Sequence, residues 1–360
     1  EDSSQTKEIA CLRLLLQNAA QAKQSRRSPA SPTKSMALSV LPMSMACTLS
    51  LGDCGLGGRS LAPAPNGVVF WETWLSKKEG TVSGRLLQIE EECVDDQELT
   101  LDIEDHLAIL TLNRPESRNP LGHIGDGVRF REASERINKN NNIRCVILTG
   151  KGKAFSAGGD IKSIRDKKGH FAGTALELRE HYRENVHGLV QALWNIEVPL
   201  IGAINGPAIG LGNDVACLCD MRIASDSAKF GATFLKLGLI PGDGGAWLLP
   251  KIIGWSRASE LFFTGEVIDA STALEWGLVS QVVAAADLDA TVGKLAQRIC
   301  AQPPNPLRMT KQLMRDAIES DFRTIMNTSA SLQSILHHTE DHDEAIDSFF
   351  KKTNAIFEGR

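Results

Sequence analysis

Short, continuous apolar runs are the feature that most constrains the fold of this 360-residue chain. Residues 107–112, 145–149 and 200–204 are such runs, and turn-forming residues follow the first two. Runs of this length, bounded by Gly, Pro or Asn, are typical of strands buried on both faces of a sheet. Helical patterns lie between them at residues 124–138 and 174–196. Strands and helices that alternate at this spacing predict an α/β fold with crossover connections.

The same patterns divide the chain into three parts. Residues 1–96 are rich in turn-forming Ser, Pro and Gly, so we expect a poorly structured extension. Residues 97–305 carry the alternating pattern, which includes a short strand at 221–224. Residues 306–360 show no strand. The further helices that periodicity predicts lie at 246–253, 256–263, 270–275, 287–300, 306–319 and 322–351.

The N-terminal extension has two possible origins. The first residue is Glu, so we expect a fragment or a processed form. Residues 20–36 are basic, rich in Ser and free of acidic residues, a composition that fits an organelle transit segment. A translated upstream stretch or a disordered tail fits it equally well. We therefore assign residues 1–96 no function.

Composition argues against two classes of partner. The net charge of −5 disfavours a surface that binds nucleic acid, and no apolar run approaches the ~20 residues that a membrane helix needs. The eight cysteines form no Cys-x-x-Cys pair, so we expect buried free thiols and a reducing compartment. We thus expect an intracellular protein, cytoplasmic or mitochondrial, that binds neither nucleic acid nor a membrane.

Four short segments, three of them rich in glycine, follow one another between residues 112 and 245. Any one of them alone is weak evidence, because Gly-rich turns are common. They are LNRPESRNPL (112–121), KAFSAGGDIK (153–162), INGPAIGLGND (204–214) and LGLIPGDGG (237–245), the last preceded by Phe230-Gly231. In this order and at this spacing, they resemble the crotonase (enoyl-CoA hydratase/isomerase) superfamily, and the resemblance covers residues 97–360.

The resemblance implies a fold, a substrate and an assembly. The fold is a spiral of β-β-α repeats over residues 97–305, followed by a C-terminal helical trimerisation region over residues 306–360. The substrate is an acyl-CoA thioester, so coenzyme A comes as part of the substrate and no cofactor is bound permanently. The assembly is a homotrimer or a hexamer, and exposed apolar residues of the last helices would face the partner subunits.

Enolate chemistry explains why such glycine turns matter. Proton removal beside a thioester carbonyl leaves negative charge on its oxygen, and two backbone N–H groups aimed at that oxygen stabilise it by ~3–4 kcal/mol each. By resemblance, the donors of this oxyanion hole are the amides of Ala157 and Leu211. Many relatives have three glycines in a row where this chain has Gly210-Leu211-Gly212. We therefore expect the Leu211 side chain to point away from the ligand.

The resemblance also implies a binding surface for coenzyme A and the acyl group, and it implies no metal site. His337, His338 and His342 with the neighbouring acids are best explained as a polar helix face. The residues expected to bind coenzyme A or substrate are Arg118, Pro120, Gly158, Gly159, Asp160, Ile161, Gly210, Gly212 and Lys352.

The acid/base residues depart from the pattern of the family's hydratases, which use two Glu residues. Asp214 falls at the first of these positions, and Phe234 falls at the second. The resemblance offers Asp243 as a substitute, since some family isomerases carry an Asp in this loop, one residue earlier at the position of Gly242. Asp243 could take part in catalysis or could cap a helix that begins near Gly245. Paired carboxyl groups serve proton transfer well because their environments can separate their pKa values.

A typical two-Glu hydratase is therefore disfavoured. Asp214, alone or with Asp243, fits isomerisation of an enoyl-CoA double bond or hydration of an unusual enoyl-CoA. Two alternatives stay open. One is a non-catalytic homologue that binds acyl-CoA or another partner, and the other is a further chemistry of the superfamily, such as that of a hydrolase or dehalogenase.

Overall fold

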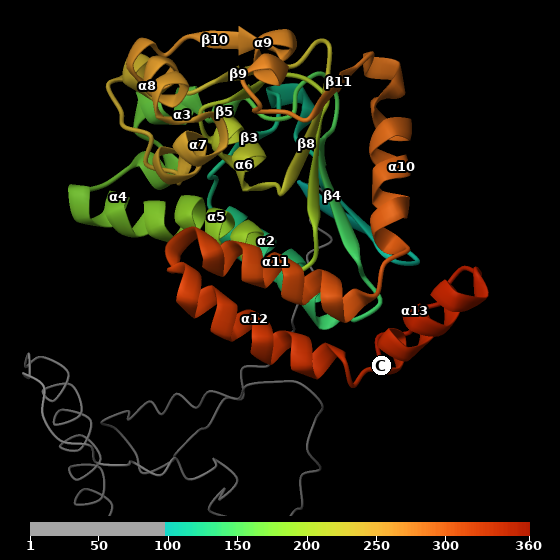
Figure 1. Ribbon diagram of the computed structural model, residues 1–360. Helices are drawn as coiled ribbons and strands as arrows, with labels where there is room; N and C mark the ends of the chain where they lie inside the picture. The colour runs from blue at the N-terminus through green and yellow to red at the C-terminus, as the bar shows by residue number, and fades with distance from the viewer. Residues whose placement is uncertain (1–97) are drawn as a thin grey trace, which may run out of the picture. The chain divides into compact units, whose positions relative to one another are not determined.

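Five of the strands in the main sheet run parallel, and each parallel pair is joined by a long crossover (Figure 1). The computed structural model describes residues 98–360, so the expectations for residues 1–96 lie outside the described part. In sheet order the strands are β1 (Leu99–Glu104), β2 (Leu107–Leu112), β4 (Cys145–Gly150), β6 (Leu200–Ile204), β8 (Met221–Ser225) and β11 (Gln281–Val283). Only β1 is antiparallel to its neighbour, β2.

Burial of the central strands on both faces explains their continuous apolar runs. Every residue of β6 is buried, as are all but one of β4. Helix α10 (Leu288–Cys300) packs on one face, where its Val292 meets Ile147 and Ile201 in a core cluster. Helices α2 (Asp126–Lys139) and α5 (His187–Trp194) pack together and contribute to the larger core cluster.

Short strands follow the strands of the main sheet and make a β-β-α repeat. After β2, β4, β6 and β8 the chain enters β3, β5, β7 and β9 in turn, and a helix follows each of these. Their bounds, with that of β10, are β3 (Pro120–Leu121), β5 (Gly158–Gly159), β7 (Ala208–Ile209), β9 (Lys229–Gly231) and β10 (Val267–Asp269). Strand β3 pairs with β5, and β7 and β10 flank β9. The predicted α/β class and the spiral of β-β-α repeats are confirmed.

The helices of the repeats agree with the sequence patterns except at two points, one of which is α3 (Ile161–Asp166), a short helix that no pattern predicted. The pattern at 174–196 predicts a single helix, but α4 (Ala175–His181) is separated from α5 by a π-helical turn, η4, at Tyr182–Val186. The remaining helices of this part are α6 (Leu211–Leu218), α7 (Gly245–Ile253), α8 (Trp255–Thr264) and α9 (Ala270–Glu275).

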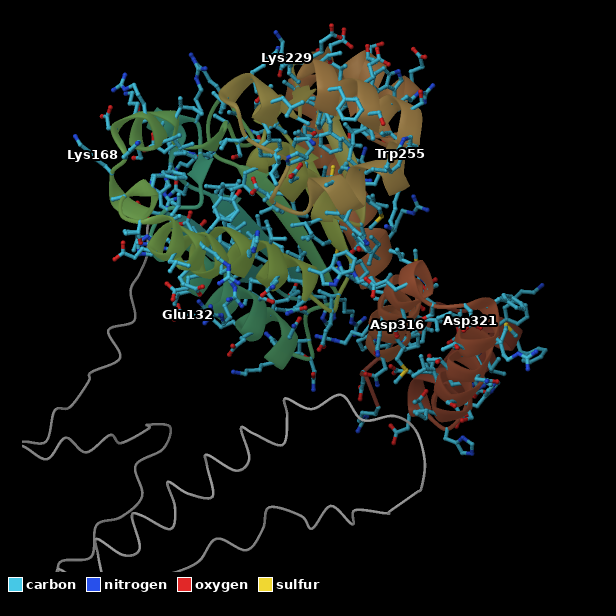
Figure 2. All side chains as sticks on the ribbon, turned by 90° about the vertical axis from the view of Figure 1, so that its left-hand side faces the viewer. Glu132, Lys168, Lys229, Trp255, Asp316 and Asp321 are labelled. Atoms are coloured by element: carbon cyan, nitrogen blue, oxygen red, sulfur yellow. The ribbon has the colours of Figure 1, made fainter. Side chains whose placement is uncertain are left out.

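Three helices end the chain: α11 (Pro304–Glu319), α12 (Phe322–Leu336) and α13 (Glu340–Lys351). The single helix predicted at 322–351 is wrong, because the Thr339 side chain accepts a hydrogen bond from the amide of His342 and starts α13 anew. Helices α11 and α12 extend from the sheet layers in Figure 2, where Asp316 and Asp321 label the ends that face each other. Buried Lys311 anchors α11, because its Nζ lies 2.7 Å from both Val198 O and Asp220 Oδ2.

Two expectations from composition can be compared with the described part of the chain. Among residues 98–360, Cys145, Cys217 and Cys219 are buried free thiols and Cys300 is half-buried. Within the same residues no helix combines the length and the apolar character that crossing a membrane requires.

Candidate active site

Two glycine turns from different repeats approach each other closely. Gly158 has φ +87°, and a Cβ built on it would lie 2.4 Å from Ile209 O and 3.4 Å from Leu211 N. A Cβ built on Gly212 would lie 2.4 Å from Ser156 O. No side chain fits at either position, so the sequence needs glycine here for close approach of backbone to backbone. The turn that holds Gly158 therefore lies against the start of α6.

The Leu211 amide stands at the junction of these turns. Leu211 is the first residue of α6, so its N–H has no acceptor within the helix, and the helix dipole adds partial positive charge there. Its side chain is 4% exposed and belongs to the main hydrophobic core. The Leu211 side chain thus packs into the core, and its backbone N–H is retained at the start of α6.

The Ala157 amide does not fit the role that we predicted for it. It donates a hydrogen bond to Arg118 O at 2.8 Å, which ties it to the preceding repeat. The next amide, that of Gly158, donates to Ser156 Oγ at 3.2 Å. Ala157 is therefore corrected from an oxyanion-hole donor to part of the backbone scaffold. The turn at Gly158 then redirects the chain toward Gly159.

Asp214 is fully buried beside the N-terminus of α7. Its Oδ2 accepts a hydrogen bond from the amide of Gly245 at 3.0 Å, and Cβ built on Gly245 would overlap the carboxyl group. Its Oδ1 is buried without a hydrogen-bond partner among the described residues. An acid that only stabilised the first turn of α6 could do so from a solvent-exposed position. The enclosed placement of Asp214 therefore favours a chemical role over helix stabilisation.

Asp243 precedes α7 by two residues but does not cap it. The N-cap of α7 is Gly244, which contributes no side-chain cap, so the capping alternative is wrong. The Asp243 carboxyl instead accepts a short hydrogen bond from the hydroxyl of Tyr182 through Oδ1. Asp243 is 3% exposed. The two predicted carboxyl groups thus flank the start of the same helix.

The π-helical turn η4 supplies two contacts to the loop that carries Asp243. Tyr182 opens the turn and reaches the Asp243 carboxyl, while His187 follows it and places Nε2 2.9 Å from Gly242 O. Because a carbonyl only accepts, His187 carries its proton on Nε2 when it makes this bond. The Tyr182 and His187 rings lie edge to face with centroids 5.1 Å apart.

Burial is the largest influence on the protonation of both carboxyl groups. Burial, and then the nearby charge of Asp243, hold the pKa of Asp214 well above its ordinary value. Burial also raises the pKa of Asp243, and the hydrogen bond from Tyr182 partly opposes that rise. The pKa of Tyr182 is raised by burial and by the Asp243 charge, so its hydroxyl stays protonated and donates. The site can hold one proton on Asp214 and a negative charge on Asp243.

Phe234 occupies the place where a second hydratase carboxylate was expected from the family pattern. It is 8% exposed, and a Cβ built on Gly210 would lie 4.0 Å from two atoms of its ring. An apolar ring therefore lies beside the turn that leads to the Leu211 amide. No carboxyl group can activate water from this position.

The residues predicted to bind coenzyme A are only partly brought together. Gly158, Gly159, Gly210 and Gly212 belong to the two converging turns, and the Pro120 strand pairs with that of Gly158. The Asp160 side chain accepts from the amides of Lys162 and Ser163 and so caps α3, and Arg118 and Ile161 are exposed. Lys352 ends α13, which lies at the opposite end of the domain from α3 (Figure 1). Within one chain, Lys352 therefore does not join this site.

Two further features lie apart from the carboxyl pair. Among the described residues no group of three or more His, Cys, Asp or Glu could hold a metal ion. The ring nitrogens His337 Nδ1 and His342 Nε2 lie 3.1 Å apart. An apolar groove of about 710 Å³ between α7 and α11 is lined by Trp194, Trp247 and Met314 and contains neither Asp214 nor Asp243.

The sequence interpretation overlooked Tyr182 and His187. Tyr182 is the only tyrosine of the chain, and it lies 61 residues before its partner. No motif spacing connects the two residues, and a helical pattern without a π-turn gives no reason to single them out. The rarity of Tyr was the one available signal.

Comparisons with known proteins identify the family. Residues 102–360 match the family model for enoyl-CoA hydratase/isomerase. The chain is 34% identical over 258 residues to 1,2-epoxyphenylacetyl-CoA isomerase of Escherichia coli K12, covering 72% of this chain and 97% of that protein. It is 33% identical over 264 residues to crotonyl-CoA hydratase of Syntrophomonas wolfei, covering 72% and 98%. The crystal structure of an enoyl-CoA hydratase from Bacillus anthracis has a TM-score of 0.69 at 32% identity and covers 73% of this chain and all of that one.

Proposed function

Because the chain belongs to the enoyl-CoA hydratase/isomerase family of enzymes, we propose that it moves the double bond of an enoyl-CoA thioester. The observation that carries the proposal is the pair of buried carboxyl groups, Asp214 and Asp243, at the start of α7 and next to the repeat that presents the Leu211 amide. Isomerisation between a 3-enoyl and a 2-enoyl thioester moves a proton from one carbon to another, which one carboxyl group or a pair of them can do, and it needs no water.

The proposed reaction proceeds through a dienolate. A carboxylate removes a proton from C2 of the 3-enoyl thioester, the C3–C4 double bond shifts to C2–C3, and a carboxylic acid delivers a proton to C4. Negative charge accumulates on the thioester oxygen between the two transfers, where the Leu211 amide and the dipole of α6 would stabilise it. We propose Gly159 in place of Ala157 as the second donor, since the amides of Ala157 and Gly158 already have acceptors.

Hydration is the second candidate, and Phe234 weighs against it. Adding water to a 2-enoyl thioester requires a base that activates water on the β-carbon side. The resemblance places that carboxylate at the position of Phe234, where an apolar ring excludes water instead. A shifted pose could still let Asp243 activate water, so both reactions belong in the test.

Purified protein with 2-enoyl-CoA and 3-enoyl-CoA thioesters tests the proposal. Interconversion of the two isomers is expected, and Asp214→Asn and Asp243→Asn should each lower kcat by about 10²–10⁴-fold, the usual contribution of a positioned acid or base. Asp102→Asn, at an exposed position of β1, is the matched control and should keep the wild-type rate. Binding of the thioester without turnover would instead support a non-catalytic homologue, and hydration that survives both variants would show that these carboxyl groups are not the acid and base.

The proposed assembly is a homotrimer or hexamer through α11 and α12. No residue of α12 is buried, and Ile318 and Phe322 are exposed on this pair of helices. An apolar surface of this kind is typical of a face that a partner covers. Sedimentation equilibrium should give a mass three or six times that of one chain, and a monomeric mass would contradict the proposal.

A further inference from the structure

Two residues other than the carboxyl pair, Tyr182 and His187, hold the loop that carries Asp243. The family pattern singles out neither of them. Tyr182 opens the π-helical turn η4 and His187 directly follows it, and the two bind adjacent residues of the loop, the side chain of Asp243 and the carbonyl of Gly242. A π-turn interrupts regular α-helical hydrogen bonding, and such turns are frequent at functional sites.

The two oxygens of Asp243 differ as a result. The hydrogen bond from the Tyr182 hydroxyl goes to Oδ1, so the two oxygens have different surroundings. In Asp214, Oδ2 accepts the hydrogen bond from the Gly245 amide, and Oδ1 is buried without a partner among the described residues. Burial raises the pKa of both carboxyl groups, but the nearby charge of Asp243 raises that of Asp214 further, whereas the Tyr182 hydroxyl partly opposes the rise in Asp243.

We propose that Tyr182 is a positioning residue that fixes Asp243 as the proton-removing base, with His187 holding the loop and Asp214 acting as the proton-returning acid. The inference rests on the proposed isomerase function and makes it more specific, because it assigns the two roles. Tyr182 itself transfers no proton: its hydroxyl orients Oδ1 and leaves Oδ2 to face the substrate carbon.

The π-turn explains how one helix supplies both contacts. Residues 182 and 187 are five apart, so in a regular α-helix they would be rotated by about 140° from one another, with 100° per residue. The π-turn places the amide of His187 on the Tyr182 carbonyl and brings the two rings into edge-to-face contact. The two side chains can therefore reach the same loop.

The single tyrosine makes the pairing measurable without substrate. Protein labelled with ¹³C at the tyrosine Cζ gives one resonance, that of Tyr182. Its chemical shift should change as Asp243 takes up a proton, this titration should disappear in Asp243→Asn, and it should remain in the control Asp102→Asn. A resonance that ignores Asp243→Asn would overturn the pairing.

Kinetics test the positioning role. Tyr182→Phe removes only the hydroxyl, so the pKa of Asp243 should rise and the acid limb of the kcat profile should shift to higher pH. At acidic pH kcat should fall by about tenfold or more, the worth of one hydrogen bond to a charged group, while KM changes little. Thr149→Val, which also removes one hydroxyl hydrogen bond, to Ala203 O at 3.0 Å, should leave the profile in place.

The outcomes separate the two levels of the argument. Turnover by Tyr182→Phe with a wild-type pH profile overturns the positioning role alone. Absence of turnover by the wild-type protein on either isomer counts against the isomerase function, and the resonance of Tyr182 then still decides whether the hydroxyl pairs with Asp243.

Discussion

The carboxyl group of Asp214 meets the first amide of α7: its Oδ2 lies 3.0 Å from Gly245 N, although the two residues belong to different repeats. The same Gly245 must lack a side chain, because a Cβ there would lie 2.1 Å from Oδ1 of Asp214. A helix N-terminus favours negative charge, while complete burial disfavours it, and burial has the larger effect here. The protonation state of Asp214, a residue of α6, thus depends on its contact with α7.

This balance predicts that Asp214 limits stability at neutral pH. The folded state binds the Asp214 proton more tightly than the unfolded chain, whose aspartates titrate near 3.9. The contribution of Asp214 to the free energy of unfolding should therefore fall as pH rises above about 4. Asn has no acidic proton, so Asp214→Asn does not carry this penalty. The variant should be more stable than wild type at pH 7 by on the order of 1–3 kcal/mol, and the gain should vanish near pH 4. Urea unfolding across this range measures the difference, and curves that stay parallel would contradict it.

The Leu211 amide can be removed while the helix is kept. Proline is tolerated as the first residue of a helix, where the N–H has no helical acceptor, so Leu211→Pro deletes the donor. We expect kcat to fall by about 10²–10³-fold, the effect of losing one oxyanion-hole donor. Leu211→Ala loses the same buried side chain but keeps the N–H, and it should retain far more activity. Equal losses in the two variants would assign the effect to packing.

The contact between the glycine turns should be sensitive to one methyl group. Gly158→Ala adds strain at φ +87° and places a Cβ 2.4 Å from Ile209 O, so the turns must separate. Backbone strain and overpacking together should cost about 2–4 kcal/mol and lower kcat. Gly277→Ala is the control, because φ there is +78° and nothing lies within 4 Å of the added Cβ. If both variants unfold at the same urea concentration, the close approach has no energetic weight.

The longer elements could be read from the sequence because burial decides them. The apolar runs of β2, β4 and β6 became buried parallel strands, and the pattern at 270–275 matches α9 at both ends. Strands β3, β5 and β7 contain two residues each, which is too few for a periodic signal, and backbone approach at glycine defines them instead.

The site was only half predictable for a related reason. Asp214 and Leu211 lie within one motif, so a resemblance could locate them. The hydrogen bond from the Ala157 amide to Arg118, and that from Tyr182 to Asp243, depend on how repeats stack in three dimensions. Helical periodicity also carries no sign of a single π-turn, which changes the direction of the side chains on either side of it.

The crossover connections of the main sheet affect how the protein folds during its synthesis. Parallel strands pair only after the chain between them has folded back, and such non-local pairing is slow. Gly158 and Tyr182 come from one repeat, Leu211 from the next and Asp243 from the one after it, so a nascent chain that has left the ribosome only as far as β8 already holds most of the sheet's central strands but lacks Asp243 and α7. Competence for chemistry is therefore acquired late in synthesis, when α7 docks against Asp214.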